Sequence, residues 1–300
     1  MSVFQEVFKQ SSIVAPKRDK RPFISESELK TCPFCLANKQ YLESIIDESW
    51  HEGKLMMRIV SNRYPITSKE GERGVHDVVI DTGEHCEHPK DFSLMHWEVL
   101  LEGIQRRWKQ LMEDKSIQMI QVFKNFGEDA GASISHSHWQ IIALEEIPNS
   151  MMKKYVDYEK KESCYLCSTI CEKEGYLVWN GTLFEVWVPP IMRFPYEAWV
   201  IPKKHHQHYG ELSLNEIKEL GKLIKYLLKI YHQINPNYAF NICMMSGMLS
   251  GQKPYHFYVQ LVMRIGHIAG FEIATGCHIL SMSPEAYADQ MKKGLKGMYK

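Results

Sequence analysis

An internal repeat at a fixed offset constrains this chain more than any other feature of its sequence. Three residues return 120 positions later: His85 as His205, His136 as His256 and Gln140 as Gln260. Each half also opens with a Cys-x-x-Cys pair, and the two pairs lie 132 positions apart: Cys32 with Cys35, and Cys164 with Cys167. The segment between the Cys pair and the first repeated His is shorter in the second half than in the first, which is why the Cys pairs lie 132 positions apart and the later residues 120. The chain is therefore an internal duplication, and its halves should build the same unit.

The apolar pattern follows the same order in each half. It predicts strands at 58–65, 76–81, 118–123 and 139–144 in the first half, and at 184–188, 198–201, 238–243 and 257–262 in the second. Between the second and third strand of each set, apolar residues recur at helical spacing from Ser93 and from about Leu214. We therefore expect a mixed α+β fold with largely antiparallel sheets and one long helix in each half.

A polar stretch separates the two repeats. Residues 148–162 are rich in charged side chains and contain Pro148, which is typical of a junction. This stretch predicts two domains, a catalytic half at 1–150 and a degenerate half at 151–300.

The residues His136, His138 and Gln140 alternate at the entrance to an apolar strand, behind a Gly-Ala-Ser loop. Side chains at alternate positions share one face of a strand. An imidazole can attack phosphorus or bind a metal, and an amide can hydrogen-bond a phosphate oxygen without supplying a proton. A polar edge strand with satisfied histidines is the simpler interpretation, but this combination favours chemistry. The second half has Tyr258 where the first has His138, so a His138 nucleophile would restrict the reaction to the first half.

The paired cysteines and the repeated histidines predict two structural zinc sites, each with four protein ligands. The first set is Cys32, Cys35, His85 and His136, and the second is Cys164, Cys167, His205 and His256. His88 is an alternative to His85, although the repeat favours His85. Since His136 lies two residues before His138, a metal there would aim the nucleophile and not act as a Lewis acid.

Composition sets the broad class of the protein. The 300 residues are 44% hydrophobic, which is enough for a packed globular core, and the formal net charge is zero. Charge therefore gives no reason to expect binding to nucleic acid or to a membrane surface. We find no apolar run that would span a bilayer and no signal peptide. The cysteines fit thiolate metal ligands in a reducing compartment better than disulfides, so we expect a cytoplasmic enzyme.

With His138 as the nucleophile, an α-phosphorus is the natural electrophile. The resulting phosphoimidazole could be attacked by a second phosphate, which gives double displacement. Gln140 would hydrogen-bond a non-bridging oxygen, while Ser133 and the backbone amides around Gly131 could hold the phosphates. A neutral amide favours transfer between phosphates over hydrolysis.

The run Asn125, Gly131, Ser133 and His136-x-His138-x-Gln140 resembles the active-site motif of galactose-1-phosphate uridylyltransferases, a branch of the histidine-triad superfamily. The resemblance covers nearly the whole chain, because residues 13–22 and 269–277 are also similar to segments of that family. The second Cys-x-x-Cys makes the chain most similar to members like the plant ADP-glucose phosphorylase, which have two zinc sites.

The resemblance implies a duplicated histidine-triad-like half-barrel, a covalent nucleotidyl-histidine at His138, and zinc at both sets. It also implies a homodimer whose active sites use residues from both subunits. The substrate-binding residues that we expect are Asn125, Gly131, Ser133, Arg58, Asn62, Glu272 and His278. Glu272 would contact sugar hydroxyls, and His278 stands where the uridylyltransferase has a hexose-contacting Gln. Ser137 stands where the usual motif has Pro, and Phe8-Lys9-Gln10 replaces an arginine-bearing segment.

Several other functions remain open at this point. Uridylyl transfer to a sugar phosphate and phosphorolysis of an ADP-sugar would use the same motif. A histidine-triad hydrolase usually has a third His in place of Gln140. A non-catalytic nucleotide or zinc protein would suit the second half alone, and a zinc-dependent nucleic-acid binder would need a basic recognition helix that this chain lacks.

Overall fold

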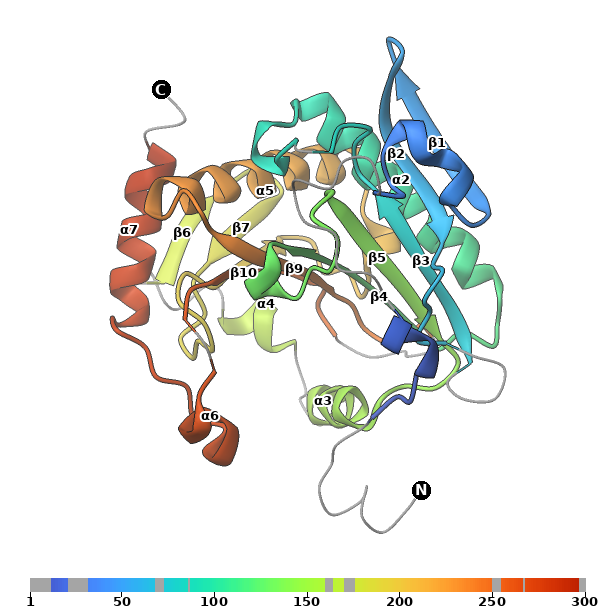
Figure 1. Cartoon of the computed structure of the whole chain (residues 1–300). Helices are drawn as coiled ribbons and strands as arrows, with labels where there is room; N and C mark the ends of the chain where they lie inside the picture. The colour runs from blue at the N-terminus through green and yellow to red at the C-terminus, as the bar shows by residue number, and fades with distance from the viewer. Residues whose placement is uncertain are drawn as a thin grey trace.

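The computed structural model describes residues 12–20, 32–67, 73–85, 87–159, 164–169, 176–249, 255–266 and 268–296. Of the residues named above, Phe8, Lys9 and Gln10 and the last two residues of the segment 13–22 lie outside these ranges. Ten strands of the described chain form one antiparallel sheet in the order β1-β2-β3-β5-β4-β9-β10-β8-β7-β6 (Figure 1).

The strands of the first half are β1 (Ile45–His51), β2 (Lys54–Ser61), β3 (Gly74–Ile80), β4 (Met119–Phe126) and β5 (His138–Leu144). Those of the second half are β6 (Leu177–Asn180), β7 (Phe184–Trp187), β8 (Ala198–Pro202), β9 (Ala239–Met245) and β10 (Tyr258–Arg264). The α-helices are α2 (Leu94–Glu113), α3 (Asn149–Glu159), α4 (Tyr165–Thr169), α5 (Leu214–Ile234), α6 (Gly270–Thr275) and α7 (Pro284–Lys296). The sequence pattern predicted α2, α5 and eight of these strands, but not β1, β6 or the other helices.

The sheet has internal pseudo-two-fold symmetry. The β4–β9 pair lies at the centre of the sheet. From this pair to each edge, the strands of the two repeats follow in the same order, so that β5 corresponds to β10 and the edge strand β1 corresponds to β6. Phe123 of β4 pairs with Cys243 of β9, which is its own equivalent at the 120-residue offset. The duplication and the antiparallel α+β fold are therefore confirmed, and both repeats share one continuous sheet. The division into 1–150 and 151–300 stays a prediction, and α3 runs across it.

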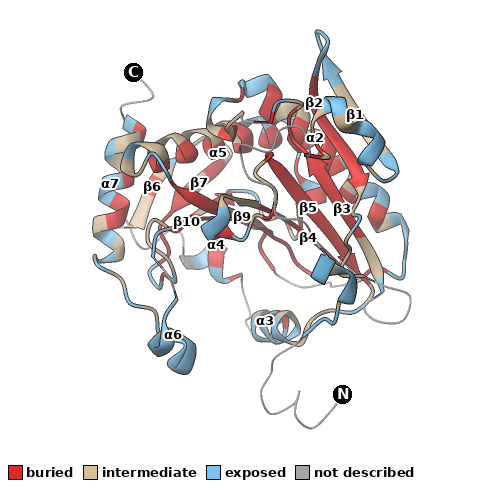
Figure 2. Ribbon diagram, in the orientation of Figure 1, coloured by how far each residue is buried: buried red, intermediate tan, exposed pale blue. Residues whose placement is uncertain are grey.

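Two equivalent helices cover one face of this sheet (Figure 2). Ser93 caps α2 by accepting from the His96 N–H at 3.0 Å. Ser213 and Glu216 form a capping box at the start of α5. The two helices pack against each other, and their apolar stripes enter one large core with Trp97, Trp108 and other side chains. The apolar spacing from Ser93 also predicts Leu94 as part of this stripe, but Leu94 lies in the first turn of α2 and is 48% exposed.

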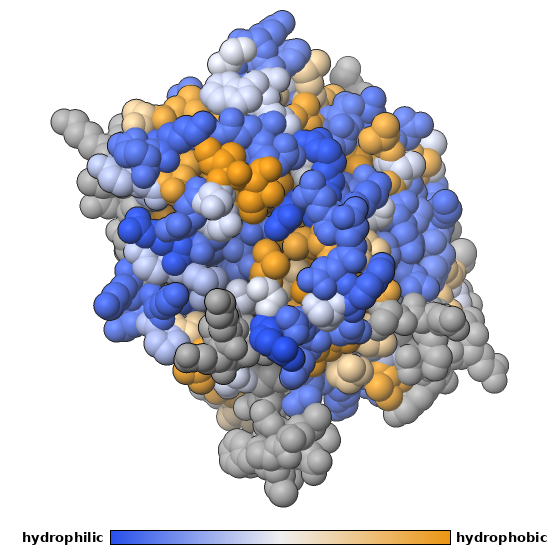
Figure 3. Space-filling model, turned by 90° about the vertical axis from the view of Figure 1, so that its right-hand side faces the viewer, coloured by the Kyte–Doolittle hydropathy of each residue, from blue (hydrophilic) through white to orange (hydrophobic). Residues whose placement is uncertain are grey.

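The opposite face of the sheet is covered by smaller apolar clusters around the Cys-x-x-Cys segments. In the first half this cluster contains Cys32, Phe34 and Val60, and in the second it contains Cys164 and Leu166. At the β1 edge the surface is mostly hydrophilic, with apolar side chains in separate patches (Figure 3). None of the helices in the described residues is both long and apolar enough to cross a bilayer.

Candidate active site

His138 is the first residue of β5 and lies on the sheet face opposite α2. Its Nδ1–H donates to the carbonyl oxygen of His136 at 2.8 Å, which places the lone pair on Nε2. The side chain is buried, and the Phe34 ring meets it edge-on with centroids 5.1 Å apart. The backbone therefore fixes both the tautomer and the ring orientation that nucleophilic attack through Nε2 requires.

Gln140 lies two residues further along the same face and is held by a residue that the sequence did not identify as functional. His76 of β3 accepts the Ile66 N–H on Nδ1 at 3.1 Å, and its Nε2 lies 3.0 Å from Gln140 Oε1. A neutral His76 with Nδ1 as acceptor carries its proton on Nε2 and donates it to Gln140. The amide NH₂ is then the end of Gln140 that can donate to a phosphate oxygen. Asn62 lies beside this pair, with Nδ2 2.9 Å from His76 Nε2, but both groups are donors in this tautomer and so do not hydrogen-bond to each other.

Strand β4 and the loop that follows it bring two further candidate residues to the site, Asn125 in the strand and Ser133 in the loop. Ser133 is buried, and its Oγ has no hydrogen-bond partner among the described residues. A buried hydroxyl in that state suits a ligand oxygen. Asn125 Oδ1 accepts from Asn241 Nδ2 of β9 at 2.9 Å, so the Asn125 amide NH₂ is the end that can meet a ligand. Asn241 was also missed by sequence reasoning, because it belongs to the other repeat.

Two glycines shape this loop. Gly127 has φ +84°, and a Cβ there would lie 2.8 Å from the Ala239 Cβ, so the loop can rest directly on β9. Gly131 has φ +82° and donates its N–H to the Glu128 carbonyl at 2.7 Å. The Ala132 N–H is also used within the loop. Phosphate contacts from the loop are therefore better supplied by the Ser133 hydroxyl than by these two amides.

The first predicted metal set comes together immediately beside His138. The four ligand atoms of Cys32, Cys35, His85 and His136 lie within 4.8 Å of one another. The Sγ–Nδ1 distances are 3.7 Å from Cys32 to His136 and 3.3 Å from Cys35 to His85. A tetrahedral zinc with ordinary Zn–S and Zn–N bonds would separate sulfur and nitrogen by about 3.5 Å. The donor set therefore fits a metal ion.

The surroundings of His136 agree with that role. Its Nε2 lies 2.9 Å from the Thr82 carbonyl oxygen, so the proton sits there and Nδ1 faces the sulfurs. Burial lowers the pKa of His136 to about 4, so the ring is neutral at physiological pH. His88, the alternative ligand, instead caps the short helix Pro89–Asp91 and packs against Phe126.

The second set has the same arrangement. The ligand atoms of Cys164, Cys167, His205 and His256 also lie within 4.8 Å of one another. Cys167 Sγ is 3.3 Å from His205 Nδ1 and 3.2 Å from His256 Nδ1, and His256 Nε2 is 2.9 Å from the Pro202 carbonyl oxygen. Both clusters can therefore hold a metal.

Arg58 of β2 pairs with Ile80, which in turn pairs with His138, so Arg58 lies on the same sheet face and in the same row as His138. It is buried, its Nε donates to Glu48, and its Nη1 has no hydrogen-bond partner among the described residues. Two other expected substrate residues lie on or after α6 instead. Glu272 is half-buried on α6, where its carboxylate accepts the Ala269 N–H at 3.1 Å. His278 follows α6, and this helix projects from the body away from β5 (Figure 1).

Comparisons with known proteins place the chain in a family. Two family models match it, "Domain of unknown function (DUF4931) N-terminal domain" at residues 15–147 and "Domain of unknown function (DUF4921)" at 95–300. The chain is 32% identical to the ADP-glucose phosphorylase of Arabidopsis thaliana, across 94% of this chain and 89% of that protein. It is also 26% identical to the galactose-1-phosphate uridylyltransferase of Thermotoga maritima, over 94% of each chain. This protein belongs to the galactose-1-phosphate uridylyltransferase family.

A solved structure of the family has the same overall fold. The Arabidopsis thaliana ADP-glucose phosphorylase with bound ADP-glucose superposes with a TM-score of 0.81 at 29% identity, covering 93% of each chain. The similarity therefore extends over both repeats and the shared sheet.

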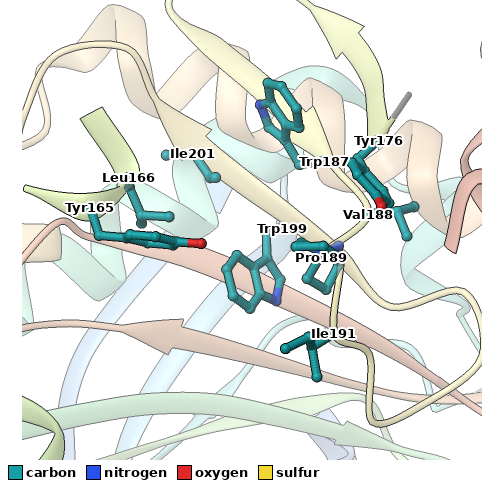
Figure 4. Close-up of a pocket in the computed structure, with 10 residues that line it drawn as sticks. Tyr165, Leu166, Tyr176, Trp187, Val188, Pro189, Ile191, Trp199 and Ile201 are labelled. Atoms are coloured by element: carbon teal, nitrogen blue, oxygen red, sulfur yellow. The ribbon is translucent and has the colours of Figure 1, made fainter. Parts of the chain in front are cut away.

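In this member of the uridylyltransferase family, the second repeat has Tyr258 at the position of His138 and an apolar pocket beside β7 and β8. A cavity of about 230 Å³ is walled by Trp187, Trp199, Tyr165, Leu166 and neighbouring side chains (Figure 4). In the sheet, Trp199 of β8 is the strand partner of Gln260. At the equivalent position of the first repeat, the partner of Gln140 is the smaller residue Val78 of β3. The Gln260 amide donates to the Glu197 carboxylate at 2.6 Å, so its NH₂ is already engaged. The two repeats thus keep the metal ligands but differ in the groups beside them.

Proposed function

We propose that this protein is a nucleotidyltransferase that moves a nucleoside monophosphate from a nucleotide sugar to a phosphate-bearing acceptor through a covalent intermediate at His138. The observation that carries the proposal is the His138 tautomer, with Nδ1–H bound to the His136 carbonyl and the lone pair on Nε2. The Ser133 hydroxyl, lacking a hydrogen-bond partner among the described residues, supplies a contact for the phosphate.

The reaction has two displacements at one phosphorus. His138 Nε2 forms a bond to the α-phosphorus while the bond from that phosphorus to the bridging oxygen breaks, releasing a sugar phosphate. The His136 carbonyl stabilises the positive charge that develops on the imidazole. The acceptor phosphate oxygen then attacks the same phosphorus and returns the electron pair to Nε2.

Gln140 favours transfer over hydrolysis in this scheme. His76 holds the Gln140 carbonyl, so the Gln140 NH₂ can donate a hydrogen bond to a non-bridging phosphate oxygen. An amide does not act as a general acid, so Gln140 does not transfer a proton to the leaving group. A third histidine at this position would be able to act as an acid. This difference opposes the hydrolase alternative.

Zinc is the metal that best suits the two Cys₂His₂ sets. In the first set it would be held by Cys32, Cys35, His85 and His136, and four protein ligands leave no open position for substrate. The metal would supply rigidity to the residue pair His136–His138. The paired thiolates suit a reducing compartment such as the cytoplasm.

Phosphorolysis of an ADP-sugar is the second candidate, with inorganic phosphate as the acceptor. The 32% identity to the ADP-glucose phosphorylase, against 26% to the Thermotoga maritima uridylyltransferase, supports an adenine nucleotide. His278 in place of the hexose-contacting Gln also makes galactose less suitable as the sugar.

Intact-protein mass spectrometry after brief incubation with UDP-glucose, UDP-galactose, ADP-glucose or GDP-mannose tests the proposal. We expect a mass increase of one nucleoside monophosphate with one of these donors, lost again on addition of the acceptor. The mass increment names the base, and the acceptor that discharges it separates phosphorylase from transferase. A folded, metal-loaded protein that is modified by none of the donors would contradict the proposed function.

We further propose a homodimer in which Glu272 and His278 act in the partner's site. Support comes from α6, which projects away from β5 and carries Phe271 and Ile273 with 54% and 75% of their surface exposed. Such apolar side chains on a projecting segment suit burial against a second copy of the chain.

Mixing two inactive variants tests this arrangement. When His138→Ala and Glu272→Ala chains are co-refolded in equal amounts, each mixed dimer has one complete site if Glu272 acts across the interface. About a quarter of wild-type activity should then return, because half of randomly assembled dimers are mixed. If Glu272 acts within its own chain, the mixture stays as inactive as its components.

A further inference from the structure

A fully buried lysine lies directly behind the nucleophile, on the helix side of the sheet. Lys124 of β4 has none of its surface exposed. Its Nζ donates to Asp81 Oδ2 at 2.7 Å, to Ser137 Oγ at 2.6 Å and to the His138 carbonyl at 3.2 Å. These three bonds use every hydrogen of the ammonium group. The Ser137 hydroxyl in turn donates to Asp81 Oδ2 at 3.2 Å, which closes the network.

This network is costly for the fold. Taking a lysine and an aspartate out of water carries a desolvation penalty that a single ion pair seldom recovers in full. Burial lowers the pKa of Lys124, and Asp81 Oδ1 has no hydrogen-bond partner among the described residues. Packing alone therefore gives no reason for these polar groups.

The second repeat builds the same strands without the network. At the matching positions Lys124 is replaced by Met244 and Ser137 by Phe257, both at the 120-residue offset. The counterpart of Asp81 is Ile201 by chain offset or Pro202 by strand register. All of these side chains are apolar, so the architecture does not need the charges. Only the repeat that has His138 retains them.

The network acts on the backbone around the nucleophile. Three successive carbonyls in the His-Ser-His run are each held by a different donor. The His136 carbonyl accepts from His138 Nδ1, the Ser137 carbonyl from the Asp81 N–H at 3.4 Å, and the His138 carbonyl from Lys124. A shift at any of these peptides would rotate the imidazole away from its present direction.

We propose that Lys124, with Asp81 and Ser137, is a positioning group that fixes the backbone of His136–His138 and thereby the direction of the His138 imidazole. This inference rests on the proposed function of His138 and adds residues that do not touch the substrate. Loss of the network should slow the attack on phosphorus without weakening substrate binding, because the binding groups lie on the other face of the sheet.

The test uses a charge-balanced variant, Lys124→Met/Asp81→Leu, since Lys124→Met alone would leave a buried carboxylate unpaired. Met244→Leu at the matching position of the second repeat is the control. Single-turnover nucleotidylation of His138, kcat and KM are measured on folded protein with both metals bound. We expect the balanced variant to lose about 10- to 100-fold in nucleotidylation rate and kcat, with KM changed by less than about threefold. The control should match the wild type.

The ¹⁵N spectrum of the His138 imidazole gives a second readout that does not need turnover. The wild type should show a single Nδ1–H tautomer, and the balanced variant a mixture. A folded balanced variant that reacts at the wild-type rate and keeps one tautomer would overturn the proposal. If the wild type forms no adduct with any donor, the proposed function fails, while the tautomer measurement still decides whether Lys124 positions the ring.

Discussion

Replacing His138 with alanine is expected to lower the transfer rate by roughly 10⁴-fold or more, the loss typical of removing a covalent nucleophile. The remaining groups can still bind the nucleotide sugar, but none of them carries a suitably oriented lone pair beside the phosphorus. Substrate binding, measured by calorimetry with the donor that labels the wild type, should weaken by less than about tenfold. The covalent adduct should be absent.

The repeat supplies a matched control for this experiment. Tyr258 occupies the position of His138 in the second half, and Tyr258→Phe alters a buried aromatic residue at the equivalent strand position. This variant should keep the wild-type rate and adduct. Retention of substantial activity by His138→Ala would mean that the acceptor attacks the donor directly, in a single displacement.

Removing a ligand from either metal set should have different effects on activity. Cys32→Ser should release the metal of the first set, lower the free energy of unfolding by several kcal/mol, and reduce transfer by on the order of 100-fold in the protein that stays folded. The loss of activity follows because His136, two residues from the nucleophile, loses its anchor. Cys164→Ser should cause a comparable loss of stability but change kcat by less than about threefold.

Metal content by elemental analysis, thermal unfolding and kcat, measured on the same preparations, separate these effects. Each variant should bind one fewer metal ion per chain than the wild type. The assignment of the first set as support for the nucleophile is wrong if Cys32→Ser loses its metal and remains folded at the full rate. Equal losses of kcat in the two variants would instead indicate a general effect on folding.

The features that could be predicted from the sequence are those written in local patterns. The two Cys/His clusters, the strand that carries His138 and Gln140, and the helix start at Ser93 each depend on spacing within a short segment or on the fixed repeat offset. The Cys pair and the histidines of each metal set are far apart in the sequence. They could be grouped because both sets recur in the two halves of the chain, although no local pattern gives the distance between them in space. The same offset favoured His85, which lies in the Cys/His cluster, over His88, whose Nδ1 caps a short helix and whose ring packs against Phe126.

The supporting residues could not be predicted, because they belong to neighbouring strands whose register no local pattern fixes. His76 contacts Gln140 across the β3–β5 pairing, and Lys124 contacts Ser137 across the β4–β5 pairing. Asn241 reaches Asn125 from the other repeat. A lone polar residue in an apolar strand is a weak signal by itself. In a duplicated chain it becomes stronger, because the second copy shows whether the fold requires it.

The pairing of Phe123 with Cys243 has a consequence for the origin of this architecture. A separate first repeat would have the free edge of β4 exposed, and two copies could join there in the manner that β4 and β9 now join, giving a symmetric ancestor with two nucleophiles. In the present chain the second copy keeps the cysteines and histidines of the metal set but has Tyr258 in place of His138.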